Sequence, residues 1–147
     1  MQQACTAYCL AIKTLIKNHE APNRAQLAVQ AVLDYAGGGN CPTICGWVQA
    51  AQQLANFVKQ EEQKAGENLF LSNRVYNVNK NMGLAMHAFV LTMYCLLRAG
   101  DKPVETFYDY CMYQVVKLQG DTDTNAAIVG GAIGAYVGLD YIDSRKL

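Results

Sequence analysis

Apolar residues recur at helical spacing along the first half of the chain. In residues 3–17 they fall three or four positions apart, which places them on one face of an amphipathic helix. A second helix is expected after Pro22, because proline suits a first helical turn, and the glycine run 37–39 should stop it. A third helix is expected from Thr43, a suitable N-cap, to about Lys64.

The second half continues the helical pattern after one irregular stretch. Residues 67–81 are rich in asparagine and show no period, so we expect a loop there, and long loops in compact domains are often functional. Further helices are expected over about 82–99, 103–118 and 123–139. No segment has the period of a strand. The sequence therefore predicts an all-α fold, a compact orthogonal or antiparallel bundle of about six helices.

Composition adds a constraint on how this bundle is covered. The chain has 147 residues, a length that suits one domain, with 52% apolar and only 16% charged residues. Soluble domains average about 25% charged residues. Either the chain associates with a membrane or a partner covers its apolar faces. A membrane span is disfavoured, because the apolar run 126–139 is shorter than the ~18–20 residues that a span needs.

Net charge and cysteine content indicate which ligands and which cellular compartment to expect. The formal net charge is zero, so no basic face for nucleic acid is expected. The six cysteines follow no secretory signal, and we expect free thiols in a reducing, intracellular compartment, most simply the cytoplasm. The Cys5–Cys9 and Cys41–Cys45 pairs do not have the spacing typical of a zinc site.

Gly120-Asp121-Thr122-Asp123-Thr124 is the segment richest in candidate chemistry. Two carboxylates and two hydroxyls lie within four residues, and hard cations such as magnesium take oxygen ligands of this kind. Asp and Thr are also common N-cap residues, so the spacing alone favours a simple helix cap. Asp123 could serve as the cap and still offer an oxygen to a metal, since a helix N-terminus favours negative charge.

A stripe of small residues follows this segment. Gly130, Gly134 and Gly138 recur at intervals of four, with Gly131 alongside. Each helical glycine is about 1 kcal/mol less favourable than alanine. We expect the helix to sit at the centre of the bundle, where glycine permits close approach of a neighbouring backbone.

The run from Gly120 to Gly138, GDTDTNAAIVGGAIGAYVG, resembles the C-terminal signature of the ADP-ribosylglycohydrolase family, which includes the ADP-ribosylhydrolases, the glycohydrolase that reactivates dinitrogenase reductase, and the J-type crystallins. Similarity extends through the preceding helices, with less specificity. The resemblance implies an all-α domain with two magnesium ions that cleaves the glycosidic bond between ADP-ribose and a protein side chain. Asp121, Asp123 and Thr124 match metal ligands of that family.

The chain departs from the family pattern in two ways. Gln119 stands where a second glycine is usual, and no Thr-Asp-Asp cluster occurs, although the family draws further ligands from one. Three ligands are too few for two octahedral magnesium ions. We therefore expect residues 1–147 to be the C-terminal part of a single domain whose N-terminal half is absent or is supplied by another chain. The alternative is a catalytically inactive structural subunit of a larger assembly.

No other residue is assigned a catalytic or substrate-binding role. His87 lies in an apolar helical pattern and is expected to be a hydrogen-bonded core or interface residue, whereas His19 follows a helix end and should be exposed or capping. The nine tyrosines are expected mainly to pack. The loop 67–81 either connects helices or lines a substrate cleft.

Overall fold

Six α-helices account for most of residues 2–38, 41–81 and 83–142, which the computed structural model describes. They are α1 (Gln2–Lys17), α2 (Arg24–Gly37), α3 (Pro42–Ala65), α4 (Ala85–Leu97), α5 (Val104–Leu118) and α6 (Thr122–Val137), followed by the short 3-10 helix η1 (Leu139–Tyr141). Within these described ranges no strand is present. The expected all-α bundle of six helices is confirmed.

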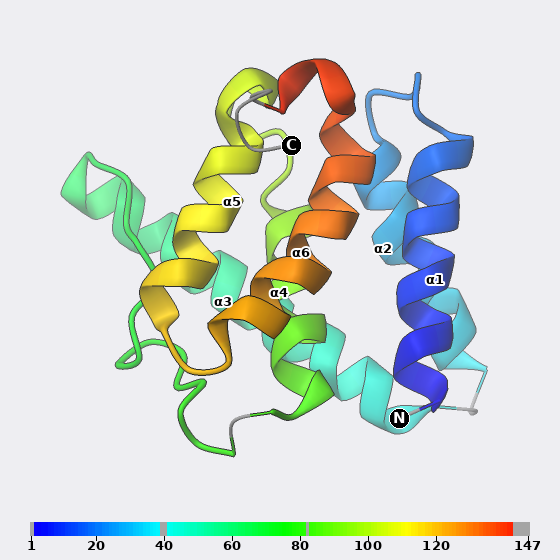
Figure 1. Ribbon diagram of the computed structural model, residues 1–147, viewed down its shortest axis with the longest axis horizontal. Helices are drawn as coiled ribbons and strands as arrows, with labels where there is room; N and C mark the ends of the chain where they lie inside the picture. Colours follow the sequence, from blue (N-terminus) through cyan, green and yellow to red (C-terminus); the bar gives the residue numbers. More distant parts are fainter. Residues whose placement is uncertain (1, 39–40, 82, 143–147) are drawn as a thin grey trace.

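The bundle is built around α4. Its residues from His87 to Leu96 are all buried, because neighbouring helices surround it on every side. In Figure 1, α6 lies in front of α4 and between α5 and α1, while the long α3 passes behind the other helices. Adjacent pairs along the chain, α1 with α2 and α5 with α6, run antiparallel (Figure 1). None of the helices in the described ranges is long and apolar enough to cross a membrane.

Some helix starts differ from the sequence-based expectation. The fourth helix begins at Ala85, not near Met82, because Gly83 has a φ of 84° and Leu84 is extended. Met82 itself lies outside the described residues. The sixth helix begins at Thr122 with Asp121 at the N-cap, one residue earlier than expected. This shift matters for the site, since it moves Asp123 into the first helical turn.

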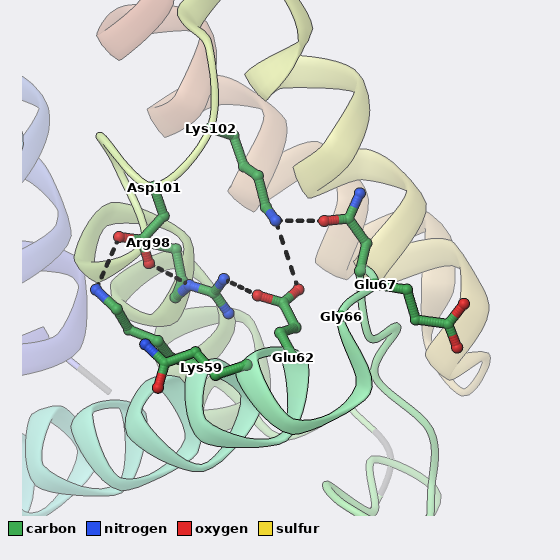
Figure 2. Close-up of a pocket in the computed structure, with 9 residues that line it drawn as sticks. Lys59, Glu62, Gly66, Glu67, Arg98, Asp101 and Lys102 are labelled. Atoms are coloured by element: carbon green, nitrogen blue, oxygen red, sulfur yellow. Dashed lines mark hydrogen bonds and ion pairs between the residues drawn. The ribbon is translucent and has the colours of Figure 1, made fainter.

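A buried arginine joins α3 to α4. The Arg98 side chain is only 2% exposed; its Nη2 donates to a Glu62 carboxylate oxygen at 2.5 Å, and its Nε donates to Asp101 Oδ2 at 2.8 Å (Figure 2). Lys59 donates to the other oxygen of Asp101 at 3.0 Å. Burial alone raises the pKa of Asp101, but the hydrogen bonds and positive charges of Lys59 and Arg98 outweigh burial and lower it.

One of the charged residues near the end of α3 faces the interior. Glu62 turns inward, and its side chain is 11% exposed, whereas Glu61 points outward and pairs with Lys64 on the surface. The Glu62 carboxylate is buried because it neutralises the Arg98 guanidinium, which lies in the interior at the end of the apolar α4. Arg98 Nη1 is buried without a hydrogen-bond partner among the described residues, so the compensation is incomplete.

The irregular segment between α3 and α4 is held against α5. The Gln114 side chain, fully buried, accepts from the Leu71 backbone N–H at 2.7 Å and donates to the Leu69 carbonyl at 3.1 Å. Asn73 Nδ2 donates to the carbonyl of Leu118, the last residue of α5, at 2.8 Å. Polar side chains thus replace the regular hydrogen bonds that this segment lacks.

The same segment reaches the turn between α5 and α6. Gly120 has a φ of 72°, and a Cβ placed there would lie 2.9 Å from Cγ2 of the buried Val78. Both the left-handed backbone and the close contact require glycine. The asparagine-rich loop and the Gly120–Thr124 segment are therefore neighbours in space.

Replacing Glu62 with alanine should destabilise the fold strongly, because the Arg98 guanidinium would lose its main buried counter-charge. We expect a loss of about 3 kcal/mol in the free energy of unfolding, measured by urea denaturation. Glu61→Ala is the matched control one residue away, and its surface pair should contribute less than about 1 kcal/mol. Equal losses for the two variants would contradict this role for Glu62.

Gly120→Ala should also destabilise the fold, by roughly 2 kcal/mol. The new Cβ would collide with Val78, and alanine is unfavourable at a positive φ. Gly66→Ala provides the comparison, because Gly66 has a similar φ of 70° with nothing within 4 Å of the new Cβ. The difference between the two free energies of unfolding isolates the contact with Val78. If the two variants lose the same stability, that contact does not constrain the turn.

Candidate functional site

The Gly120–Thr124 segment forms the turn that opens α6. Asp121 occupies the N-cap position, and its backbone carbonyl accepts from the Asn125 N–H at 3.0 Å, but its side chain makes no capping hydrogen bond. Asp121 is half-buried, while Asp123 and Thr124 are exposed. The expectation that Asp123 caps the helix is wrong, since the helix begins one residue earlier. The Asp121 carboxylate makes no capping hydrogen bond, whereas the Asp123 carboxylate accepts from backbone N–H groups of the first turn.

The two carboxylates are close together. The pKa of Asp123 is lowered by a hydrogen bond from the Thr124 backbone N–H, then by a hydrogen bond with the Asp121 carboxyl group, and then by its own backbone N–H. The first-turn N–H groups of a helix favour negative charge in this way. Asp123 is therefore ionised at neutral pH, with the Asp121 carboxyl group within hydrogen-bonding range.

The side chains of the turn are of the type that a hard cation binds, but there are too few of them to fill its coordination shell. Asp121, Asp123 and Thr124 supply only oxygen, and magnesium takes oxygen ligands in an octahedral arrangement. Across the described ranges, however, no group of three or more His, Cys, Asp or Glu side chains is placed to hold a metal ion. The turn therefore offers oxygen donors of the kind that magnesium takes, but too few to hold an ion by themselves.

Neighbouring helices fix the helix that carries the turn. Gly130 faces Tyr108 Oη and Met112 Sδ of α5, at 3.2 and 3.4 Å from an added Cβ. On the other side Gly131 faces Tyr8 Oη at 3.1 Å, and that hydroxyl donates to the Ile128 carbonyl at 2.7 Å. The glycines thus admit side chains of α5 and α1. We expected these glycines to admit a neighbouring backbone, but Gly130 and Gly131 face side chains.

Other titratable residues have structural roles. His87 is buried, with its two ring nitrogens 3.1 Å from Tyr76 Oη and 3.0 Å from the Lys80 carbonyl, as expected for a hydrogen-bonded core histidine. His19 is exposed, also as expected. Burial raises the pKa of Tyr76 to about 12, so its phenol stays neutral.

The cysteines divide into buried and exposed groups. Cys41, Cys95 and Cys111 are buried, Cys45 is half-buried, and Cys5 and Cys9 are exposed on α1. Burial raises the pKa of Cys111 well above its ordinary value, and the neighbouring Cys95 adds to the effect. Buried thiols of this kind are unreactive.

A polar cleft of about 560 Å³ lies over the Arg98 network (Figure 2). Lys59, Arg98 and Lys102 face Glu62 and Asp101 there, and Lys102 also donates to Asn68. Sequence reasoning missed this cluster, although Arg98 as the single cation of the apolar stretch 85–99 was a signal for it. Its charges compensate one another, and none of its lining residues belongs to the turn at Asp121.

Comparison with known proteins bears on the whole chain. The sequence profile of the family described as ADP-ribosylglycohydrolase matches residues 1–147. No curated protein and no solved structure gives a significant match. The family match agrees with the all-α bundle and with the signature that begins at Gly120. On this evidence of fold, signature and a profile match over residues 1–147, the chain belongs to the ADP-ribosylglycohydrolase family.

Proposed function

We propose that Asp121, Asp123 and Thr124 bind magnesium as one side of a two-ion centre, and that the completed centre hydrolyses the glycosidic bond between ADP-ribose and a protein side chain. The observation that carries the proposal is the pair of adjacent carboxyl groups at the start of α6, in a chain that matches the family over residues 1–147. The substrate would be an ADP-ribosylated protein, with ADP-ribose as the product.

Each residue of the turn contributes a separate property. Asp123 is held ionised by backbone N–H groups and is exposed, so its charge is available to a cation. Asp121 supplies a second carboxylate from a half-buried position, and Thr124 adds a hydroxyl from the same exposed turn. When bound, magnesium ions of such a centre polarise oxygen atoms of the substrate and lower the pKa of a coordinated water.

The remaining ligands must come from residues other than this turn. Two octahedral ions require about twelve ligand positions, and three protein oxygens with water do not define them. We propose that residues 1–147 act as the C-terminal part of one ADP-ribosylglycohydrolase-like domain, which another segment or chain completes. Val78 lies against Gly120, so the loop 67–81 is a neighbour of the Gly120–Thr124 turn, and we propose that it forms one wall of a substrate cleft.

The alternative is a family member that serves as a structural subunit without catalysis. Two observations favour it: the described residues bring no third carboxylate, histidine or cysteine to the turn, and α1 exposes an apolar face. Either role is compatible with an intracellular, reducing compartment such as the cytoplasm, which we propose from the cysteine content.

Metal binding by the turn can be measured directly. We expect Mn²⁺, used as a spectroscopic substitute for magnesium, to bind the protein, with the free ion counted by electron paramagnetic resonance. Asp121→Asn and Asp123→Asn should each weaken binding by about tenfold or more, since each removes one anionic ligand. Asparagine is as good an N-cap as aspartate, so the fold should persist.

Asp140→Asn is the control for this measurement, because Asp140 is exposed in η1, outside the turn. Equal Mn²⁺ affinity in all three variants and the unchanged protein would contradict a metal site at the turn. Added magnesium should displace the bound Mn²⁺.

Hydrolysis is tested on ADP-ribosylated peptides that carry arginine or serine linkages, with the chain and any protein that co-purifies with it. We expect magnesium-dependent release of ADP-ribose from one linkage and its loss on addition of EDTA. Asp123→Asn should slow the reaction by roughly 100-fold, the effect of losing several kcal/mol of electrostatic stabilisation. If no ADP-ribose is released from either linkage with the partner present, hydrolysis is excluded and the structural role is supported.

A further inference from the structure

An exposed apolar stripe runs along α1. Cys5, Cys9, Ile12 and Ile16 fall at i, i+4, i+7 and i+11, so they share one face of the helix. The core-facing residues of α1 are others, namely Ala4, Ala7, Ala11 and Leu15. Ile16 is 60% exposed, and Cys5 and Cys9 are exposed too. A second apolar face on one helix indicates a surface that packs against something.

Two hollows follow this stripe and share Cys9. The first, about 320 Å³, lies among α1, α4 and α6, with Tyr8, Phe89 and Ile128 in its wall. The second, about 560 Å³, lies further along α1 over Ile12 and Ile16. Both hollows border Cys9, the second over α1 alone, and we call the surface that they make along α1 the α1–α6 groove. The wall of the first hollow is made almost entirely of apolar groups, so it suits a hydrocarbon side chain better than a polar small molecule.

The α6 side of the groove is low. Gly131 is exposed, lies beside Tyr8 of α1 and has no side chain. In Figure 1, α1 and α6 lie beside each other with α4 behind them. A helix laid between α1 and α6 could therefore bring its backbone close to α6 while its larger side chains enter the hollows.

Positive charge marks the outer edge of the groove. Lys13 and Lys17 are exposed, lie one turn apart and line the second hollow. Neither forms a salt bridge within the described part of the chain. Neither α1 nor α4 contains an acidic residue, and Glu20, three positions after Lys17, lies 3.7 Å from the His19 ring. A ligand that complements this edge carries carboxylates.

We propose that the α1–α6 groove is a docking site for an amphipathic helix of a partner protein. Apolar side chains of that helix at i, i+4, i+7 and i+11 enter the groove, and acidic side chains along one edge face Lys13 and Lys17. Pairing of α1 with α1 of a second copy brings further lysines and no carboxylate to this edge, because α1 lacks acidic residues. The proposal does not depend on metal binding or hydrolysis.

The test uses two fluorescent helix-forming peptides of matched length. Both carry leucines at i, i+4, i+7 and i+11; one has glutamates along one edge, and the other has lysines there. We expect the acidic peptide to bind with micromolar affinity by fluorescence anisotropy and the basic peptide at least about tenfold more weakly. Reversing the protein charges in Lys13→Glu/Lys17→Glu should invert this preference.

A footprint and a matched variant locate the binding. Bound acidic peptide should slow the reaction of a maleimide with Cys5 and Cys9, identified by mass spectrometry. Ile16→Glu should weaken binding about tenfold, while Phe57→Glu, at another exposed apolar residue on α3 (45% exposed), should leave it unchanged. Circular dichroism checks that each variant retains its helices.

Several results would overturn the proposal. Equal binding of the two peptides, an unchanged preference after charge reversal, or unprotected Cys5 and Cys9 would each exclude this mode of docking. A dimer in sedimentation velocity that Ile16→Glu dissociates would assign the groove to a second copy of the chain. The Mn²⁺ measurement is independent, so failure here and failure of the metal site are distinguishable.

Discussion

Burial of α4 on all sides is the constraint from which the rest of the bundle follows. A helix with ten consecutive buried residues, His87 to Leu96, must be surrounded, and α1, α2, α3 and α6 supply its neighbours. The constraint has a further consequence at the end of the helix, where Arg98 enters the interior with it. Glu62 and Asp101 form ion pairs with the Arg98 guanidinium, because this buried charge is not hydrated by water.

The periodicity of apolar residues predicts a helix where the burial of each residue is set by its position along that helix. The segments 82–99 and 123–139 were identified as helices for this reason, and the glycines from position 37 marked the end of the second helix. The inward turn of Glu62 could not be predicted, because it depends on Arg98, which lies 36 positions away in the sequence. Periodicity carries no information about which surface charge a distant element will bury.

The candidate site was predictable to a similar extent. The residue types and spacing of Asp121, Asp123 and Thr124 indicated oxygen ligands, but not whether the carboxyl groups lie together, since this depends on where α6 begins. The role of Val78 at the turn could not be seen either, because the segment that carries it has no period. Asparagine content marked the loop, while the buried valine makes the contact that requires Gly120.

The hydrogen bond from Tyr8 to the Ile128 carbonyl joins residues 120 positions apart, and this has a consequence for folding. Contacts between nearby segments, such as α1 with α2 and α5 with α6, close short loops and form early. The α1–α6 contact closes a loop of most of the chain, so it forms late. During synthesis α1 emerges before α6, so the surface of α1 that packs against α6 stays uncovered until the glycine-rich helix has been made.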